Sequence, residues 1–206
     1  MIKTISVAPM MDCTDKHEIY FLSLISKNIH LYTEMIVANA IVRGDRNKLL
    51  SFKNVSNPVI LQIGGSDPDQ LAEACKISED YGYKEINLNL GCPSKKVQKN
   101  KFGACLMQEP DLVGKCIEAM TKATKLPVTI KTRIGYNEIE NFEFLKSFIQ
   151  TTKNAGSKNF RIGTFITAPP IPIGAEIKPL MIPDSPFANK PIFISKFFSF
   201  SLRNSK

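Results

Sequence analysis

Short runs of apolar, β-forming residues alternate with longer amphipathic stretches through the first 156 residues of the chain. The apolar runs predict strands at residues 4–9, 30–35, 58–63, 85–90 and 127–132. The amphipathic stretches predict helices at residues 14–27, 66–82, 109–124 and 141–156. Alternating strands and helices are typical of parallel βαβ units, and nearly continuous apolar strands indicate a sheet that is covered on both faces.

The pattern leaves two α/β folds open, a doubly wound sheet and part of a barrel. One further strand is readable at residues 158–163, so that about five to six βα units fit the chain. Residues 169–206 break the pattern, since they hold seven of the 13 prolines and end in a Phe- and Ser-rich run. Proline removes backbone donors and interrupts helix and sheet. We therefore expect a domain over residues 1–163 and an irregular, poorly packed tail over residues 164–206.

The composition, 43% hydrophobic and 22% charged, is ordinary for a globular protein. No run approaches the roughly 18 apolar residues that span a bilayer, and the N-terminus lacks an apolar stretch typical of a secretory signal. The five cysteines are odd in number and scattered, which favours free thiols in a reducing compartment, and no Cys/His cluster indicates a metal. We expect a cytoplasmic monomer with neither a metal nor membrane contact.

The net charge of +8 raises the question of a nucleic-acid partner. Most of the excess lies in the last part of the chain: residues 157–206 carry seven Lys/Arg against two acidic residues. The first 156 residues carry 20 Lys/Arg against 17 acidic residues. Bulk charge is therefore weak support for RNA binding by the βα region.

Chemically distinctive residues follow each predicted strand at its carboxyl end. In chain order they are Pro9, Met10 and Met11, then Glu34, then Gln62, then Asn87, Asn89 and Cys92, and finally Lys131 and Arg133. Ligands of parallel α/β folds bind at the carboxyl ends of the strands, and polar groups inside apolar strands are costly unless they have partners. The pattern therefore predicts a single site at one end of the sheet.

Three of these residues have a functional and a structural interpretation from the sequence alone. Cys92, in a turn between Gly and Pro, suits a nucleophile or a proton donor, but most free cysteines are small buried hydrophobes. Lys131 suits a phosphate or an anionic ring, or it extends its ammonium out of the strand end. The Gln62 amide can donate and accept, as reading a flavin ring edge requires, or it satisfies neighbouring backbone groups.

Five segments, in order, resemble tRNA-dihydrouridine synthases, most closely the A subgroup. They are SVAPMMDCTDKH (6–17), LYTEM (31–35), LQIGGSDP (61–68), EINLNLGCPSKKVQKNKFGACLM (85–107) and PVTIKTRIG (127–135). The similarity runs from about residue 5 to about residue 156 with the family's spacing. The NLNLGCPS and FGACLM segments are the most specific.

The resemblance implies a TIM (β/α)8-type barrel that binds FMN at its mouth and uses NADPH to reduce uridine in tRNA to 5,6-dihydrouridine. It places Pro9, Met10 and Met11 at the flavin ring, and Gln62 and Lys131 in polar contact with the flavin. Asn89 would contact tRNA near the target base. Cys92 would be the proton donor, as a neutral thiol acting as a general acid.

The sequence departs from the family after Gly156. There the family carries a His-Ala-Arg-Lys-type sixth strand, later segments that hold the FMN phosphate, and a helical tRNA-binding domain. This chain reads NFRIGTFITAPP at the sixth-strand position. We therefore expect an incomplete barrel, a truncated copy of the enzyme with little or no activity. Two alternatives stay open, a related flavin barrel that reduces free pyrimidines and a non-catalytic remnant.

Overall fold

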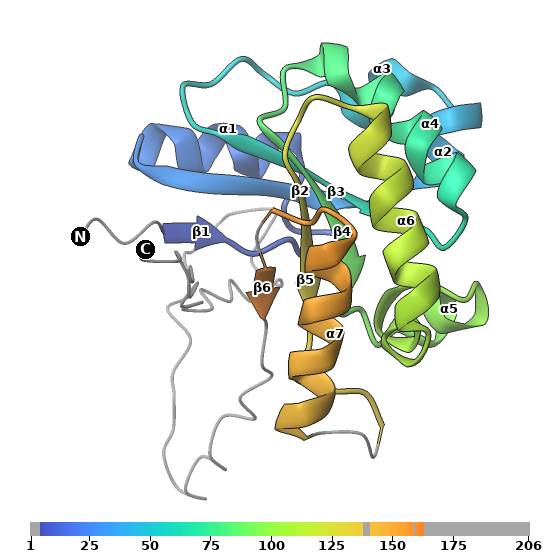
Figure 1. The fold of residues 1–206 in the computed structure, drawn as a ribbon. Helices are drawn as coiled ribbons and strands as arrows, with labels where there is room; N and C mark the ends of the chain where they lie inside the picture. The colour runs from blue at the N-terminus through green and yellow to red at the C-terminus, as the bar shows by residue number, and fades with distance from the viewer. Residues whose placement is uncertain (1–4, 138–140, 159, 163–206) are drawn as a thin grey trace, which may run out of the picture. The chain divides into compact units, whose positions relative to one another are not determined.

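Six parallel strands form one sheet in the computed structural model, which describes residues 5–137, 141–158 and 160–162. The strands are β1 (Ile5–Val7), β2 (Ile29–Val37), β3 (Val59–Gly64), β4 (Glu85–Leu90), β5 (Val128–Thr132) and β6 (Phe160–Ile162). Each strand pairs with the next one along the chain, in the order β1-β2-β3-β4-β5-β6 (Figure 1). A doubly wound sheet reverses its strand order at a switch point, whereas a (β/α) barrel does not. The order therefore selects an incomplete barrel.

Helices connect the strands. They are α1 (Lys16–Ile25), α2 (Ala38–Arg43), α3 (Arg46–Leu50), α4 (Pro68–Ser78), α5 (Lys95–Lys99), α6 (Pro110–Ala123) and α7 (Phe142–Asn154), with 3₁₀ turns at Glu79–Tyr81 and Gly103–Gln108. The side chains of Asp15 and Asp67 accept hydrogen bonds from the first backbone N–H groups of α1 and α4 and so cap these two helices. Helix α6 packs against α4 and α7, so the three lie side by side (Figure 1).

The hydrophobic pattern missed the connection between β2 and β3. Strand β2 continues to Val37, and two short helices, α2 and α3, follow it. Helices of six and five residues are too short to show a helical period in a window of about 11 residues. Asp45 nevertheless marks the start of α3, because its side chain accepts a hydrogen bond from the Lys48 backbone.

Every residue of β3 and β4 is buried, as expected for a sheet that is covered on both faces, but the two faces differ in polarity. On the helix-covered face, side chains such as Leu61, Leu88 and Ile130 join the core with Ile117 of α6 and Phe148 of α7. The alternate positions of the same strands are polar and mostly buried, and they include Gln62, Asn87, Asn89 and Thr129. One face therefore supplies apolar packing and the other carries polar chemistry.

The predicted tail, residues 164–206, lies outside the described residues, and both the boundary at 163 and the poor packing stay predictions. No helix among the described residues is long and apolar enough to cross a membrane.

We expect the core under α7 to dominate the stability of the barrel fragment. Phe148 is 1% exposed, whereas Phe142 of the same helix is 73% exposed. Replacing Phe148 with Ala should lower the free energy of unfolding by about 3–5 kcal/mol in urea denaturation, because it leaves a cavity. The matched change Phe142→Ala should cost no more than about 0.5 kcal/mol. Equal losses would contradict this assignment of the core.

Candidate functional site

The polar side chains of β3, β4 and β5 stand in register on one face of the sheet. Gln62 is the strand partner of Asn87, and Asn87 that of Thr129. Two residues farther along, Asn89 is the partner of Lys131. Register and the two-residue period of strands thus bring five polar side chains close together near the carboxyl ends.

Hydrogen bonds join the amides to the loop that follows β4. The Oδ1 atom of Asn89 accepts from the backbone N–H groups of Gly91, at 3.1 Å, and Cys92, at 2.9 Å. The Nδ2 atom of Asn89 donates to Gln62 Oε1 at 2.8 Å. The Nε2 atom of Gln62 donates in turn to Asn87 Oδ1, also at 2.8 Å. The amides therefore connect the Cys92 loop to the interior of the sheet.

The same series of bonds continues to a buried acid. Asn87 Nδ2 donates to Thr129 Oγ1 at 2.9 Å, and Thr129 Oγ1 donates to Glu85 Oε1 at 2.6 Å. The Tyr32 hydroxyl donates to the same Glu85 oxygen at 3.2 Å. We call this set of residues the polar chain: Tyr32, Glu85, Thr129, Asn87, Gln62 and Asn89. All six side chains are at most 9% exposed, so each bond replaces a contact with water.

Cys92 is half-buried, and its backbone is held from two directions. Besides the bond from its N–H to Asn89, its carbonyl accepts from the Ala104 N–H at 3.0 Å. Gly103 has a φ of 78°, and a Cβ atom there would lie 2.8 Å from the Cys92 carbonyl oxygen. Only glycine permits this approach, so the FGACLM segment fixes the Cys92 loop.

Lys131 lies on the same face, beside Asn89. Burial lowers the pKa of its ammonium below the ordinary value, the nearby Arg133 guanidinium lowers this pKa further, and Cys92 acts in the opposite direction. Arg133 also donates from Nε to the Gly91 carbonyl at 2.8 Å. Lys131 is therefore a half-buried cation next to the thiol, a position where an anionic or carbonyl group of a ligand would relieve the burial cost.

The segment after β1 forms a tight turn. Pro9 and Met10 are half-buried, and Met11 is 55% exposed. Thr14, which is buried, accepts from the Met10 N–H at 3.0 Å and donates to the Met10 carbonyl at 3.2 Å. This turn follows the carboxyl end of β1, two strands away from Gln62 in the order of the sheet.

Glu34, in the second half of β2, contributes a partly buried carboxyl group next to this turn. Burial raises the pKa of Glu34, and the charges of Asp12 and Asp15 add to this, while the backbone N–H groups of Asp12 and Cys13 oppose it. Its Oε1 atom is buried without a hydrogen-bond partner among the described residues. The backbone N–H of Glu34 donates to the Thr14 carbonyl at 3.1 Å, which ties β2 to the turn.

The structure thus brings together four of the seven residues selected from the sequence. Gln62, Asn89, Cys92 and Lys131 cluster at one end of the sheet, and their ligand roles stay predictions. Pro9, Met10 and Met11 follow the carboxyl end of β1, and β2 separates this strand from β3.

The roles of Glu85 and Thr129, together with Tyr32, were missed from the sequence. For Glu85 the signal was the strict alternation in EINLNL, where positions 85, 87 and 89 are polar and the residues between them apolar.

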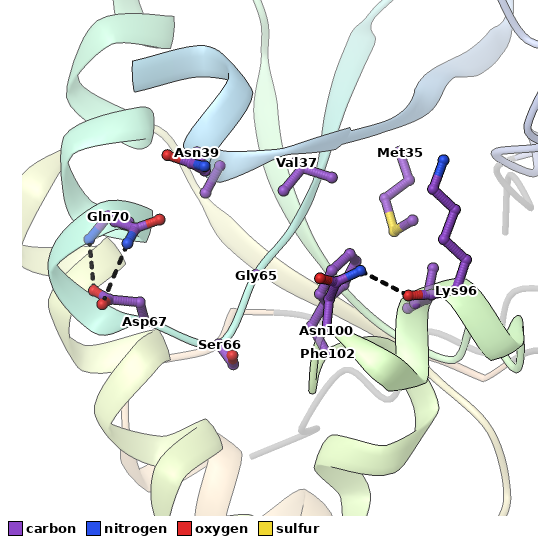
Figure 2. A pocket seen from close by; sticks show the side chains of 12 residues that line it. Met35, Val37, Asn39, Gly65, Ser66, Asp67, Gln70, Lys96, Asn100 and Phe102 are labelled. Carbon is purple, nitrogen blue, oxygen red and sulfur yellow. Dashed lines mark hydrogen bonds between the residues drawn. The ribbon is translucent and has the colours of Figure 1, made fainter. Parts of the chain in front are cut away.

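A separate pocket of about 390 Å³ opens beside β2 and β3 (Figure 2). Its apolar lining includes Met35, Val97 and Phe102. Figure 2 shows Asn39 and Gln70 on one side of the pocket and Lys96 and Asn100 on the other. None of the seven residues to which the resemblance assigns a role lines this pocket, but Met35, the strand partner of Gln62, does.

Comparisons with known proteins agree with the motifs on this face. A tRNA-dihydrouridine(20/20a) synthase of Synechocystis sp. is 52% identical over 161 residues, which cover 78% of this chain and 48% of that protein. The Escherichia coli (strain K12) protein of the same name is 50% identical over 151 residues, 73% of this chain and 44% of that protein. The chain spans about half the length of the curated relatives it matches. The family model for dihydrouridine synthase (Dus) matches residues 6–163. The chain belongs to the dihydrouridine synthase family.

Proposed function

We propose that the polar face of this sheet is the flavin and uridine site of a tRNA-dihydrouridine synthase, which reduces uridine in tRNA. The observation that supports this most is the clustering of Gln62, Asn89, Cys92 and Lys131 at the carboxyl ends of β3, β4 and β5. The relatives named tRNA-dihydrouridine(20/20a) synthase support the same reaction class. We place this enzyme in the cytoplasm, acting on tRNA without a metal. The free cysteines are consistent with a reducing compartment.

The residues present fit FMN. Lys131 is a half-buried cation that gains from a ring oxygen or another anionic group of the flavin. Gln62 uses one N–H of its amide on Asn87 and keeps a second N–H for a ring edge. Pro9, Met10 and Met11 supply apolar surface at the end of β1. When bound, FMN would supply the hydride for the reduction, with NADPH as the source of electrons.

Cys92 would hold the proton that C5 of uracil needs when C6 is reduced. A thiol suits this role as a general acid, and the two backbone bonds at Cys92 keep the loop in place. Asn89 would contact the RNA near the same base. The target base must leave its stack to reach this recessed face, as in other enzymes that act on bases.

FMN binding should depend on pH through Lys131. Because the pKa of Lys131 is lowered, its ammonium loses its proton at a lower pH than an ordinary lysine, and its attraction for the flavin declines as pH rises through that value. Fluorescence titration of FMN between about pH 7 and pH 10.5 should show weakening toward high pH. Lys131→Arg, which keeps its charge, should flatten the profile, and Lys131→Ala should weaken binding at every pH. Identical profiles for the wild type and the arginine variant would exclude this role for Lys131.

The proton-donor role of Cys92 predicts a selective loss. In a chimera that joins residues 1–163 to the C-terminal half of the Synechocystis relative, Cys92→Ala should slow uridine reduction by about 10²–10⁴-fold. The reduction of bound flavin by NADPH should be unchanged, because it needs no proton from Cys92. Mass spectrometry of dihydrouridine and stopped-flow absorbance measure the two steps.

Cys105→Ala is the matched control for that measurement. Cys105 is also half-buried and lies close by along the chain, but its thiol donates to the Phe102 carbonyl, at 3.2 Å. This variant should retain both rates. Normal uridine reduction by the Cys92→Ala chimera would return Cys92 to a packing role. A chimera that binds no flavin would instead support the non-catalytic interpretation.

A further inference from the structure

We propose that Glu85, Thr129 and Asn87 are positioning residues: through the polar chain they hold the Asn89 amide so that it offers N–H donors, and not its oxygen, to the ligand. The inference about orientation depends only on the hydrogen bonds of the polar chain and needs no bound ligand. Its consequence for base recognition rests on the proposed function.

At the Asn89 end of the polar chain, the backbone fixes the direction in which the hydrogen bonds run. The N–H groups of Gly91 and Cys92 can only donate, so the atom of Asn89 that faces them is the oxygen. The nitrogen of Asn89 therefore faces Gln62 and donates to its oxygen. A flip of Asn89 would break both backbone bonds and turn an N–H against an N–H.

At the Glu85 end of the polar chain, a second and independent constraint fixes the same hydrogen-bond direction. Oε1 of Glu85 accepts from the hydroxyls of Tyr32 and Thr129. A hydroxyl has one hydrogen, and Thr129 uses it on Glu85, so its oxygen can only accept from Asn87. Asn87 must then present its own oxygen to the amide of Gln62, as observed. All the donors in the chain point toward Glu85.

This orientation determines what the site can read. One N–H of Asn89 is used on Gln62, and a second belongs to the same nitrogen, whereas its oxygen already accepts two bonds. Asn89 can therefore donate to a carbonyl oxygen but cannot turn to accept from an amino group. Uracil carries a carbonyl oxygen at C4 where cytosine carries an amino group. The polar chain would thus favour uracil at a position that Glu85 does not itself touch.

Removing the Thr129 hydroxyl from the middle of the polar chain tests whether the effect reaches the Cys92 loop. Thr129→Val keeps the shape of the side chain and removes the hydroxyl, which leaves the Asn87 amide without its acceptor in a buried site. We expect the backbone N–H groups of Gly91 and Cys92 to exchange with solvent about tenfold faster, relative to the Leu88 N–H, which reports the stability of the strand. NMR hydrogen exchange on the 206-residue chain measures this ratio.

Two variants separate positioning from a packing defect. Thr129→Ser retains the hydroxyl and should restore the wild-type ratio. Thr152→Val makes the same substitution at another fully buried threonine, whose hydroxyl bonds only within α7, and should leave the ratio unchanged. If Thr129→Val and Thr152→Val give the same ratio, the polar chain does not position the Cys92 loop.

A second variant covers the case in which Thr129→Val does not fold. Glu85→Met keeps roughly the size of the side chain but removes the oxygen that accepts from Tyr32 and Thr129, so the same exchange ratio should rise by about tenfold. A wild-type ratio in Glu85→Met would overturn the proposal.

FMN binding and hydrogen exchange test two different claims. In FMN titrations, Thr129→Val should weaken binding several-fold through Gln62, and Thr129→Ser should not. If the wild-type chain binds no FMN, the proposed function fails on this chain, whereas the exchange ratios still decide whether the polar chain sets the orientation of Asn89.

Discussion

A buried carboxyl group at the start of β4 orders the polar face of this sheet. Glu85 accepts from Tyr32 and Thr129, and every further donor of the polar chain points toward it. Burying such a group is costly unless its hydrogen bonds are satisfied, so the strands on either side must supply donors at the matching height. The register of β3, β4 and β5 meets this requirement, and the same register carries Gln62, Asn89 and Lys131 to the site.

The loop after β4 is held in place by Asn89 of the polar chain and by the close approach that Gly103 allows. Asn89 holds the N–H groups of Gly91 and Cys92, while Gly103 lets the following turn approach the Cys92 carbonyl. A thiol that donates a proton to a carbon atom has to keep a fixed position relative to it, since small misplacements slow such transfers greatly. The two supports come from different segments, so the loop geometry is determined by the fold and not by the loop sequence alone.

The sequence predicted the long elements and the clustering of Gln62, Asn89, Cys92 and Lys131 at one end of the sheet, because elements and strand ends are local features. Asp15 and Asp67 cap their helices through bonds to residues two and three positions along the chain. The hydrophobic pattern left the barrel and the doubly wound sheet undecided, since strand order depends on contacts between distant residues, whereas the family resemblance implied the barrel that the strand order confirms. The sequence also selected Gln62 and Asn89 without showing that they bind each other, and it gave Glu85 no role. The hydrogen-bond partners of Glu85 lie 44 and 53 residues away in the chain, beyond any local pattern.

One face of the sheet packs the apolar core and the other holds the polar chain. This separation follows from the two-residue alternation of side chains along a strand. Leu88 packs under the helices, while its neighbours Asn87 and Asn89 face the site. A one-residue slip of β4 would exchange the faces: it would bury amides against Leu61 and Ile130 and expose leucines to the ligand. The polar chain therefore acts as a register lock as well as a positioning device, because its bonds form at only one alignment of β3, β4 and β5. The proposed orientation of Asn89 and a unique strand register thus depend on the same side chains.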